Sequence, residues 1–260
     1  MKKIWTSVLN KDEKLAQKVM GDCKQYGLEP DGHFWNDNLE KMGWMAPREN
    51  ILDKDVALWL IVAAKEDFES KDIRFGLSLL SIAVQATRGN GFPTVILYGG
   101  GELSEDDLPT PLKHAQVLSP EGGYGPKLVA KANMPFKPAQ SDYRMDVYGL
   151  PSGLGLWFEV GPAQGHTWNG AMFGASSPGE VNAHGVGPKN ELPKGKMILN
   201  YPMEGLKINL GEKEYTANAV KNELDENNSY FVRVADVPDS ILFGEFSEDD
   251  EAEVFVAKLT

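Results

Sequence analysis

The sequence contains a single cysteine, Cys23, among its 260 residues. One cysteine excludes an internal disulfide and a zinc site built from several thiolates, and it favours a reducing compartment. No uninterrupted apolar run approaches the roughly 18 residues that a membrane span needs. The apolar part of Met1–Leu9 is too short for the core of a secretory signal, and charges follow it at once. We therefore expect a cytoplasmic protein that does not enter a membrane.

Positive charge is also scarce. The chain has 26 Lys and Arg against 38 Asp and Glu, a formal net charge of −12. Residues 1–140 hold 17 basic and 19 acidic side chains, whereas residues 141–260 hold 9 and 19. Neither half has the excess of cations that phosphate binding exploits, so we expect neither nucleic acid nor an anionic membrane as a partner. The unequal charge indicates a division of the chain near residue 140.

Several signatures of catalysis and metal binding are missing. No serine lies in a nucleophile elbow, and Gly99–Gly101 lacks the following helix and the glycine spacing of a dinucleotide fingerprint. The acidic segment Ser247–Glu253 lacks the alternating ligand positions of a calcium loop, so we expect a solvated turn there. The sequence predicts no cofactor and no resident metal.

The stretch Asp55–Val84 organises the first half of the chain. Asp55–Ala64 is almost continuously apolar, which is typical of a strand buried on both faces of a parallel sheet. A polar turn with five charges follows at Lys65–Lys71. Asp72, a suitable N-cap, then begins a segment in which apolar residues recur at helical spacing up to Arg88. Phe92–Tyr98 reads as the next buried strand, so the stretch predicts a βαβ unit.

Further strands are expected at residues 4–9, 29–35 and 114–118, and further helices at residues 12–25 and 125–132. Together they predict a five-stranded, doubly wound parallel α/β sheet of flavodoxin-like topology over residues 1–133. Ligands of such sheets bind at the carboxyl ends of the strands. The polar turn and the glycines at Gly99 and Gly100 lie at such ends, although glycines there also suit a plain flexible turn.

Residues 134–142 include two prolines and read as a linker. Residues 143–260 then break into about ten short apolar or alternating segments, from Arg144–Leu150 to Ala252–Leu259 and including Thr167–Gly174 and Lys196–Tyr201. Turn residues separate them. This pattern predicts an acidic all-β domain, either a sandwich or a partly closed barrel.

Three motifs of the first domain resemble those of Toll/interleukin-receptor (TIR) domains. Ser7–Ala16 is similar to the family's opening "S-x-x-D-E-x-x-A". Phe34–Asp37 followed by Gly43-Trp44 and Ile51–Val56 resembles the family's BB loop and its run into the third strand. Ser70–Leu77 is similar to the start of the family's "S-x-W-C-R-x-E-L" helix. A flavodoxin-like or response-regulator-like domain would share the topology.

The resemblance implies a signalling or interaction protein that binds a nucleotide-type ligand, a protein partner or another copy of itself. In family members that cleave NAD, a glutamate in the helix motif is catalytic, but Gly76 takes its position here and Asp72 takes that of the tryptophan. Glu66 and Glu69 are the candidates for a displaced catalytic glutamate, and a solvated acidic loop is the alternative. The ligand-binding candidates are Thr6, Ser7, Asn10, Trp35, Asp37, Ser70, Arg74, Gly99 and Gly100.

The β domain has candidates of its own. His166 and His184, with Glu159 or Glu180, are residue types that bind metals, but their spacing does not demand it and surface histidines are commoner. Trp157 and Trp168 with Phe158 and Phe173 form either an aromatic platform for a sugar or base, or part of the core. Cys23 lies on the expected apolar face of its helix, which disfavours covalent catalysis.

Three readings therefore stay open. The leading one is a non-catalytic interaction protein with a TIR-like domain. The second is an NAD hydrolase that uses Glu66 or Glu69. The third places ligand or glycan binding in the β domain, around His166 and Trp168.

Overall fold

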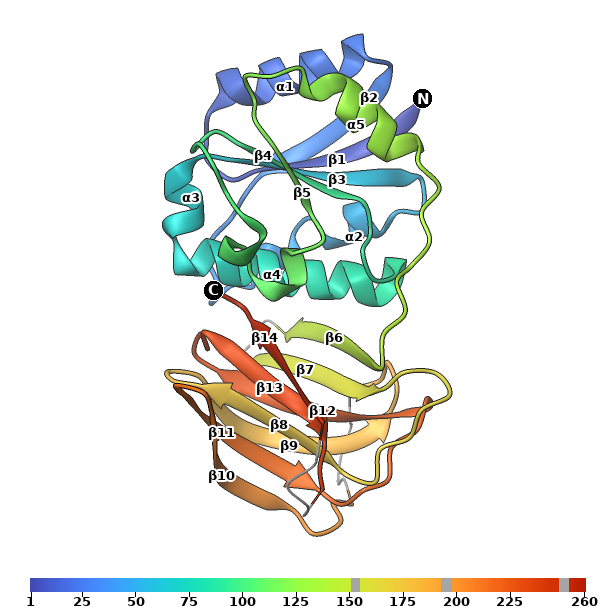
Figure 1. The fold of residues 1–260 in the computed structure, drawn as a ribbon, viewed down its shortest axis with the longest axis vertical. Coiled ribbons are helices and arrows are strands. Elements are labelled where there is room, and N and C mark those ends of the chain that lie inside the picture. The colour runs from blue at the N-terminus through green and yellow to red at the C-terminus, as the bar shows by residue number, and fades with distance from the viewer. Residues whose placement is uncertain (151–154, 193–197, 248–252) are drawn as a thin grey trace. The chain divides into compact units, whose positions relative to one another are not determined.

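The computed structural model describes residues 1–150, 155–192, 198–247 and 253–260. The chain divides into two compact units, the α/β unit at Met1–Ala139 and the β unit at Gln140–Thr260 (Figure 1). The division lies within the segment that was predicted to be a linker. Of the helices in the described residues, none is long and apolar enough to cross a membrane.

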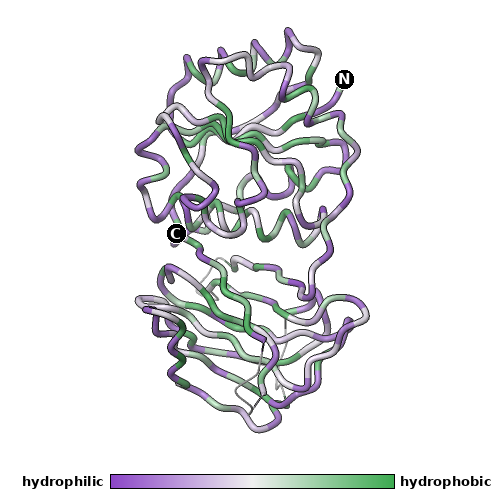
Figure 2. Tube along the Cα trace, in the orientation of Figure 1, coloured by the Kyte–Doolittle hydropathy of each residue, from purple (hydrophilic) through white to green (hydrophobic). Residues whose placement is uncertain are grey.

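The α/β unit contains a five-stranded sheet in the order β2-β1-β3-β4-β5, and every strand pair in it is parallel. This confirms the predicted parallel α/β sheet. Hydrophobic residues follow the strands at its centre (Figure 2). The strands are β1 (Lys2–Val8), β2 (Leu28–Phe34), β3 (Val56–Ala63), β4 (Thr94–Tyr98) and β5 (Gln116–Leu118).

Helices cover both faces of this sheet (Figure 1). Helices α1 (Glu13–Gln25) and α5 (Tyr124–Asn133) pack on one face, in a cluster with Ile4, Leu60 and Leu97. Helices α2 (Arg48–Leu52) and α4 (Lys71–Arg88) lie on the other face. Because strand residues alternate between faces, β3 needs an apolar residue at nearly every position, and seven of its eight residues are buried.

The polar turn after β3 is more structured than its sequence predicts. Residues 65–69 form a short helix, α3 (Lys65–Glu69), and Ser70 lies between it and α4. The Ser70 hydroxyl accepts a hydrogen bond from the Ile73 amide at 3.4 Å, so Ser70, and not the expected Asp72, is the N-cap of α4. The remaining short elements of this unit are the 3-10 turns η1 (Gly43–Met45), η2 (Glu105–Asp107) and η3 (Thr110–Leu112).

Arg88 fixes the end of α4 to the start of β3. One of its terminal nitrogens donates to the carbonyls of Ile51 and Asp53 at 2.9 and 2.7 Å, and the other donates to the carbonyl of Val56 at 2.8 Å. Its guanidinium also lies 4.4 Å from the centre of the Phe92 ring. One side chain thus satisfies three carbonyls where α2 ends and β3 begins.

The β unit consists of two antiparallel sheets, with strand orders β10-β11-β8-β13-β14 and β6-β7-β12-β9. Phe158 on β7 contacts Phe173 on β8 with ring centres 5.3 Å apart, so side chains of the two sheets meet in one core. The strands are β6 (Tyr143–Leu150), β7 (Gly155–Pro162), β8 (Ala171–Ser176), β9 (Glu180–Pro188), β10 (Met203–Leu210), β11 (Lys213–Val220), β12 (Asn228–Ala235), β13 (Ser240–Glu245) and β14 (Val254–Lys258).

Some strand predictions for the β unit need correction. The segment Thr167–Gly174 is not one strand, because Trp168 makes only an isolated bridge to Leu224 and β8 begins at Ala171. Residues 198–201 of the expected strand Lys196–Tyr201 are not in a strand, and the rest of it lies outside the described residues. Residues 248–252 of the predicted acidic turn also lie outside them.

A buried ion pair joins three strands of the smaller sheet. Glu159 on β7 is 2% exposed and lies 3.7 Å from Arg144 on β6. The Ser229 hydroxyl on β12 and the Asn190 amide also donate to Glu159, at 2.5 and 2.9 Å. The Tyr148 hydroxyl donates to its second oxygen. Because these donors satisfy the carboxylate, it serves as a structural clamp in the sheet.

We expect Arg88→Ala to lower the free energy of unfolding of the α/β unit by about 2–4 kcal/mol, because three carbonyls lose a charged donor. Urea denaturation of the full chain, with hydrogen exchange of the α4 amides to localise the effect, measures the loss. Lys65→Ala is the control, because Lys65 is 62% exposed and makes only a surface ion pair with Glu69. Equal effects of the two substitutions would contradict this role for Arg88.

Candidate functional site

The carboxyl ends of the parallel strands are the first place to look for a site. The strand order reverses between β1 and β3, and in open α/β sheets ligands bind at such a point. The segments that emerge there are the turn after β1 with Asn10, helix α3 after β3, and the glycines after β4. The segment that starts at Trp35 follows β2 at the same edge.

Gly76, which the sequence resemblance would align with a catalytic glutamate, lies against buried aromatic residues. A Cβ atom on Gly76 would lie 3.0 Å from Cζ2 of Trp35, 3.4 Å from Cβ of Trp44 and 3.7 Å from Leu39. Trp35 and Trp44 are 6% and 1% exposed. The absence of a side chain at Gly76 therefore lets α4 approach the indole of Trp35 and the Cβ atom of Trp44 closely, and the space that a longer side chain would need is filled.

Both indoles have a buried polar atom. The Nε1 atoms of Trp35 and Trp44 find no hydrogen-bond acceptor among the described residues. The two side chains contribute to this part of the core through packing contacts. Trp35, predicted to bind a ligand, is thus a core residue whose ring edge faces α4.

Thr6 and Ser7 do not face one site. They are consecutive in β1 and point to opposite faces of the sheet. Ser7 lies on the α4 side, where its hydroxyl accepts a hydrogen bond from Trp59 Nε1 at 2.9 Å. Thr6 is fully buried on the α1 side, beside Gly32 of the neighbouring strand.

Asn10 and Asp37 lie at the surface of this edge. The Asn10 side-chain oxygen accepts from the Asp12 amide at 3.2 Å, and Asp12 in turn caps α1 by accepting from the Leu15 amide at 3.0 Å. Asn10 thus supports the start of a helix. Asp37 is exposed in the segment after β2.

Arg74 is held by backbone carbonyls. Its guanidinium donates to the carbonyl of Phe68 at 3.5 Å and to that of Asp107 at 2.9 Å. Burial lowers the pKa of Arg74, and the nearby charge of Asp107 opposes that shift. Because a guanidinium stays protonated in proteins, Arg74 is a cation that ties α3 and η2 to α4.

The two candidate catalytic glutamates are exposed side chains of α3. Glu66 projects into solvent, and Glu69 forms an ion pair with Lys65 at 3.6 Å. The buried carboxylate of this helix is Asp67, which the sequence did not single out. Its oxygen accepts from the Ala64 amide at 2.7 Å, and burial raises its pKa. Asp67 therefore caps the amino end of α3, and neither candidate glutamate is enclosed in a cleft.

The glycines after β4 have an internal reason to be glycines. The Gly99 amide donates to the carbonyl of Ala63 at 2.9 Å and so continues the pairing of β3 with β4. A Cβ atom on Gly100 would lie 2.3 Å from the Tyr98 hydroxyl and 2.8 Å from Lys65 Cβ. Close packing against Tyr98 and Lys65 thus explains why this position is a glycine.

His33 is the titratable residue of this region that sequence reasoning left without a role. It lies on β2 beside Ser7 of β1, and its ring stacks on Trp5 with centres 5.9 Å apart. Trp5 Nε1 donates to His33 Nδ1 at 3.2 Å, which requires an unprotonated Nδ1. Burial lowers the pKa of His33 from 6.5 to about 4. His33 is therefore neutral at pH 7.

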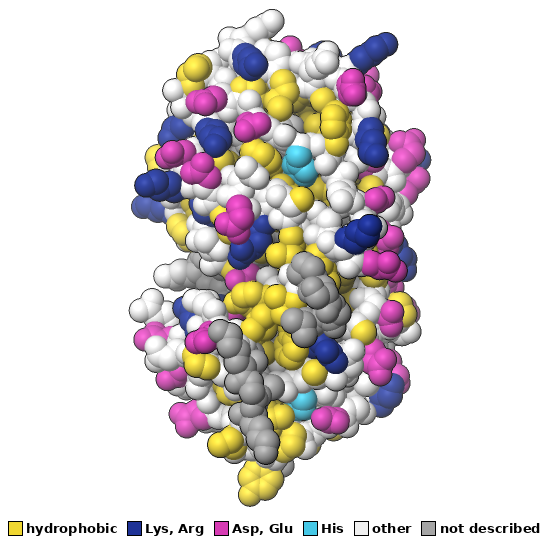
Figure 3. All heavy atoms as spheres, turned by 180° about the vertical axis from the view of Figure 1, so that it is seen from behind, with side chains coloured by type: hydrophobic (Ala, Val, Ile, Leu, Met, Phe, Trp, Pro, Cys, Tyr) yellow, Lys and Arg dark blue, Asp and Glu magenta, His cyan; other side chains and the backbone are white. Residues whose placement is uncertain are grey.

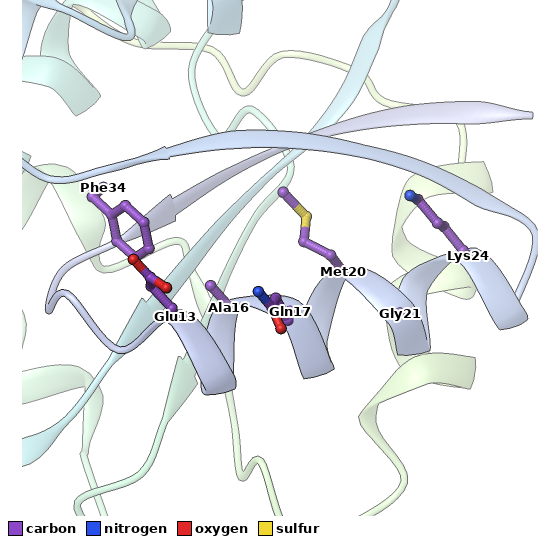
Figure 4. A pocket seen from close by; sticks show the side chains of 7 residues that line it. All are labelled: Glu13, Ala16, Gln17, Met20, Gly21, Lys24 and Phe34. Atoms are coloured by element: carbon purple, nitrogen blue, oxygen red, sulfur yellow. The ribbon is translucent and has the colours of Figure 1, made fainter.

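A hollow lies on the outer side of α1, away from the predicted site. It encloses about 440 Å³ between α1 and the end of the edge strand β2 (Figure 4). Sequence reasoning missed it, although Met20 is an apolar residue of α1 outside the inward-facing group of Leu15, Ala16, Val19 and Cys23. Its lining residues are Glu13, Ala16, Gln17, Met20, Gly21, Lys24 and Phe34.

The thiol of Cys23 faces the core of the α/β unit. It is fully buried, and burial raises its pKa to about 11. At neutral pH it is a protonated thiol, which is neither a nucleophile nor a metal ligand.

The four aromatic residues of the β unit that suggested either a platform or part of the core do not share one face of a sheet. Trp157 and Phe158 are consecutive in β7 and therefore point to opposite faces, so Phe158 joins Phe173 in the core. Trp168 is 6% exposed. Trp157 lies on the other face, where the Arg233 guanidinium is 6.0 Å from its ring centre.

The histidines of the β unit are separated as well. His184 is buried, with Nδ1 2.6 Å from the Tyr230 hydroxyl and Nε2 3.2 Å from a Glu204 oxygen. His166 is exposed in a turn. Within the described residues, no three His, Cys, Asp or Glu side chains are grouped so that they could hold a metal.

A second hollow, of about 650 Å³, lies beside Ser176, Lys207 and Lys213.

Comparison with known proteins does not assign the chain. No protein-family model matches the sequence, and no curated protein matches it. The class that the structure defines is a two-unit protein, with a parallel α/β sheet followed by antiparallel β sheets.

We expect Gly76→Ala to lower the free energy of unfolding by about 1–2 kcal/mol, because the new methyl group strains the contact with Trp35 by more than the helix gains from alanine. Gly21→Ala on α1 is the matched control. A Cβ atom there has open space within 4 Å, so the substitution should raise stability by up to about 1 kcal/mol. Chemical denaturation measures the free energy of unfolding of both variants. An increase in both variants would contradict the packing described for Gly76.

We expect His33 to make stability depend on pH between about 6.5 and 4. Its folded pKa is below the unfolded value, so the unfolded chain binds the proton first and stability falls as pH drops through this window. The loss should approach about 3 kcal/mol at its lower end. His33→Gln keeps an acceptor for Trp5 but cannot titrate. The difference between the two denaturation profiles should therefore be constant above about pH 7 and change between about pH 6.5 and 4, and profiles that stay parallel throughout would exclude this effect.

Proposed function

We propose that the α/β unit is a TIR-like domain that acts by binding and does not turn over NAD. The observation that supports this proposal is the packing of Gly76 against Trp35 and Trp44, because the resemblance aligns Gly76 with the family's catalytic glutamate. The strand order β2-β1-β3-β4-β5 with helices on both faces supports the doubly wound, flavodoxin-like topology that this class requires.

The surroundings of the predicted ligand site favour a protein partner over a nucleotide. Ser7, Ser70 and Arg74 already make hydrogen bonds within the α/β unit. A nucleotide would need convergent donors and an apolar slot for its base. Beside Gly76 that space is occupied by side-chain atoms of Trp35, Trp44 and Leu39, which leaves the outer surfaces of the domain for recognition.

The charge of the α/β unit suits a protein partner. On the face shown in Figure 3, acidic and basic side chains are interspersed over this unit. Residues 1–140 are close to neutral, with 17 basic and 19 acidic side chains. Mixed charge of this kind allows specific pairing without strong long-range repulsion between copies. We therefore assign the chain to signalling or scaffolding by protein interaction.

The other two readings have less support. A displaced catalytic glutamate needs an enclosed carboxylate, whereas Glu66 and Glu69 are exposed. A ligand site in the β unit around His166 and Trp168 lacks its platform, because Phe158 and Phe173 fill the core.

We expect the purified full-length chain to release no nicotinamide from NAD above the rate without protein, even at high protein concentration. Chromatographic detection of nicotinamide measures this. Glu66→Gln and Glu69→Gln should give the same result as the unaltered chain. Nicotinamide release that either substitution abolishes would overturn the non-catalytic assignment. Saturable calorimetric binding of NAD or ADP-ribose without cleavage would shift the assignment from a protein partner to a nucleotide.

A further inference from the structure

The hollow on α1 has a regular chemical layout. Its residues recur at Glu13, Ala16 and Gln17, Met20 and Gly21, and Lys24, which places them on one stripe of the helix. Figure 4 shows Glu13 and Lys24 at opposite ends of the hollow. The four positions between them carry no charge.

The stripe is self-complementary about its own midpoint. Glu13 and Lys24 are equally far from the point between residues 18 and 19, and so are Ala16 and Gly21, and Gln17 and Met20. A two-fold axis through that point would bring a second copy of α1 alongside in the antiparallel sense. Glu13 of each copy would then face Lys24 of the other, because the two residues lie about 20° apart around the helix.

The small residues make close approach feasible. Gly21 leaves room for a neighbouring backbone, because a Cβ atom built on it meets nothing within 4 Å. Met20 is half-buried, and Phe34 at the end of β2 is 40% exposed. Both offer apolar surface to the rim of such a contact. A parallel arrangement would oppose Glu13 to Glu13, so the charges select the antiparallel one.

The geometry points to this hollow as the site where a second copy of the same chain docks, α1 against α1, in a symmetric antiparallel pair. The inference rests on the proposed function as an interaction protein and names the partner. A single pair of helices buries little surface, so the dimer is weak and depends on concentration.

Sedimentation velocity of the full-length chain from about 10 to 500 µM tests the pairing, because weak interfaces dissociate within this range. We expect a dimer at the upper end. Lys24→Glu or Glu13→Lys alone places like charges together at both ends of the contact and should raise the dissociation constant at least about tenfold. The double variant Glu13→Lys/Lys24→Glu should restore association. Circular dichroism verifies that α1 still folds in each variant.

Lys18→Glu is the matched control, because Lys18 is an exposed residue of α1 outside the hollow. It should leave the dissociation constant within about twofold of the original. A monomer at every concentration overturns the pairing, and so does a dimer that the single reversals leave intact. Neither result bears on NAD cleavage, so the nicotinamide assay still tests the proposed function separately. Conversely, nicotinamide release would overturn that function even if the dimer forms.

Discussion

The strand β3 must be covered on both of its faces, and much of the α/β unit follows from that requirement. Seven of its eight residues are buried, so one layer of helices cannot suffice. Helices α1 and α5 cover one side and α2 and α4 the other. Arg88 then satisfies the carbonyls around the start of the strand. Gly76 lets α4 settle onto Trp35 and Trp44.

In this arrangement, many side chains of types that can perform chemistry instead stabilise the fold. Ser70 and Asp67 cap helices, Arg74 binds two carbonyls, and Ser7 accepts from an indole. A side chain committed to the fold in this way cannot reorganise around a substrate without loss of stability. The surfaces that stay free are lateral ones, such as the outer stripe of α1. This distribution supports the proposed role in recognition.

The architecture could be predicted from the sequence where the apolar residues follow one clear pattern, either a continuous run or helical spacing. The continuous apolar run of β3 and the helical spacing of α4 identify both elements within a residue or two. Helix α3 was missed because five charges in seven residues conceal its two buried members, Asp67 and Phe68.

The candidate site was harder to predict from the sequence, because the role of each residue depends on contacts between distant segments. The partners of Gly76 lie over 30 residues away, and no local pattern shows that two indoles fill the space beside it. Thr6 and Ser7 were both ligand-binding candidates, yet they face opposite sides of the sheet. Trp157 and Phe158 separate for the same reason. In each case strand alternation, applied strictly, would have split the pair in advance.

The burial of Cys23 has a practical consequence for measuring distances in this molecule. Because the one native thiol is enclosed and protonated at neutral pH, it should resist alkylation by maleimides while the protein stays folded. A cysteine introduced at an exposed position of either unit would then accept a spin label or fluorophore without prior removal of the native one. Pairs of such labels could report the separation of the two units in solution.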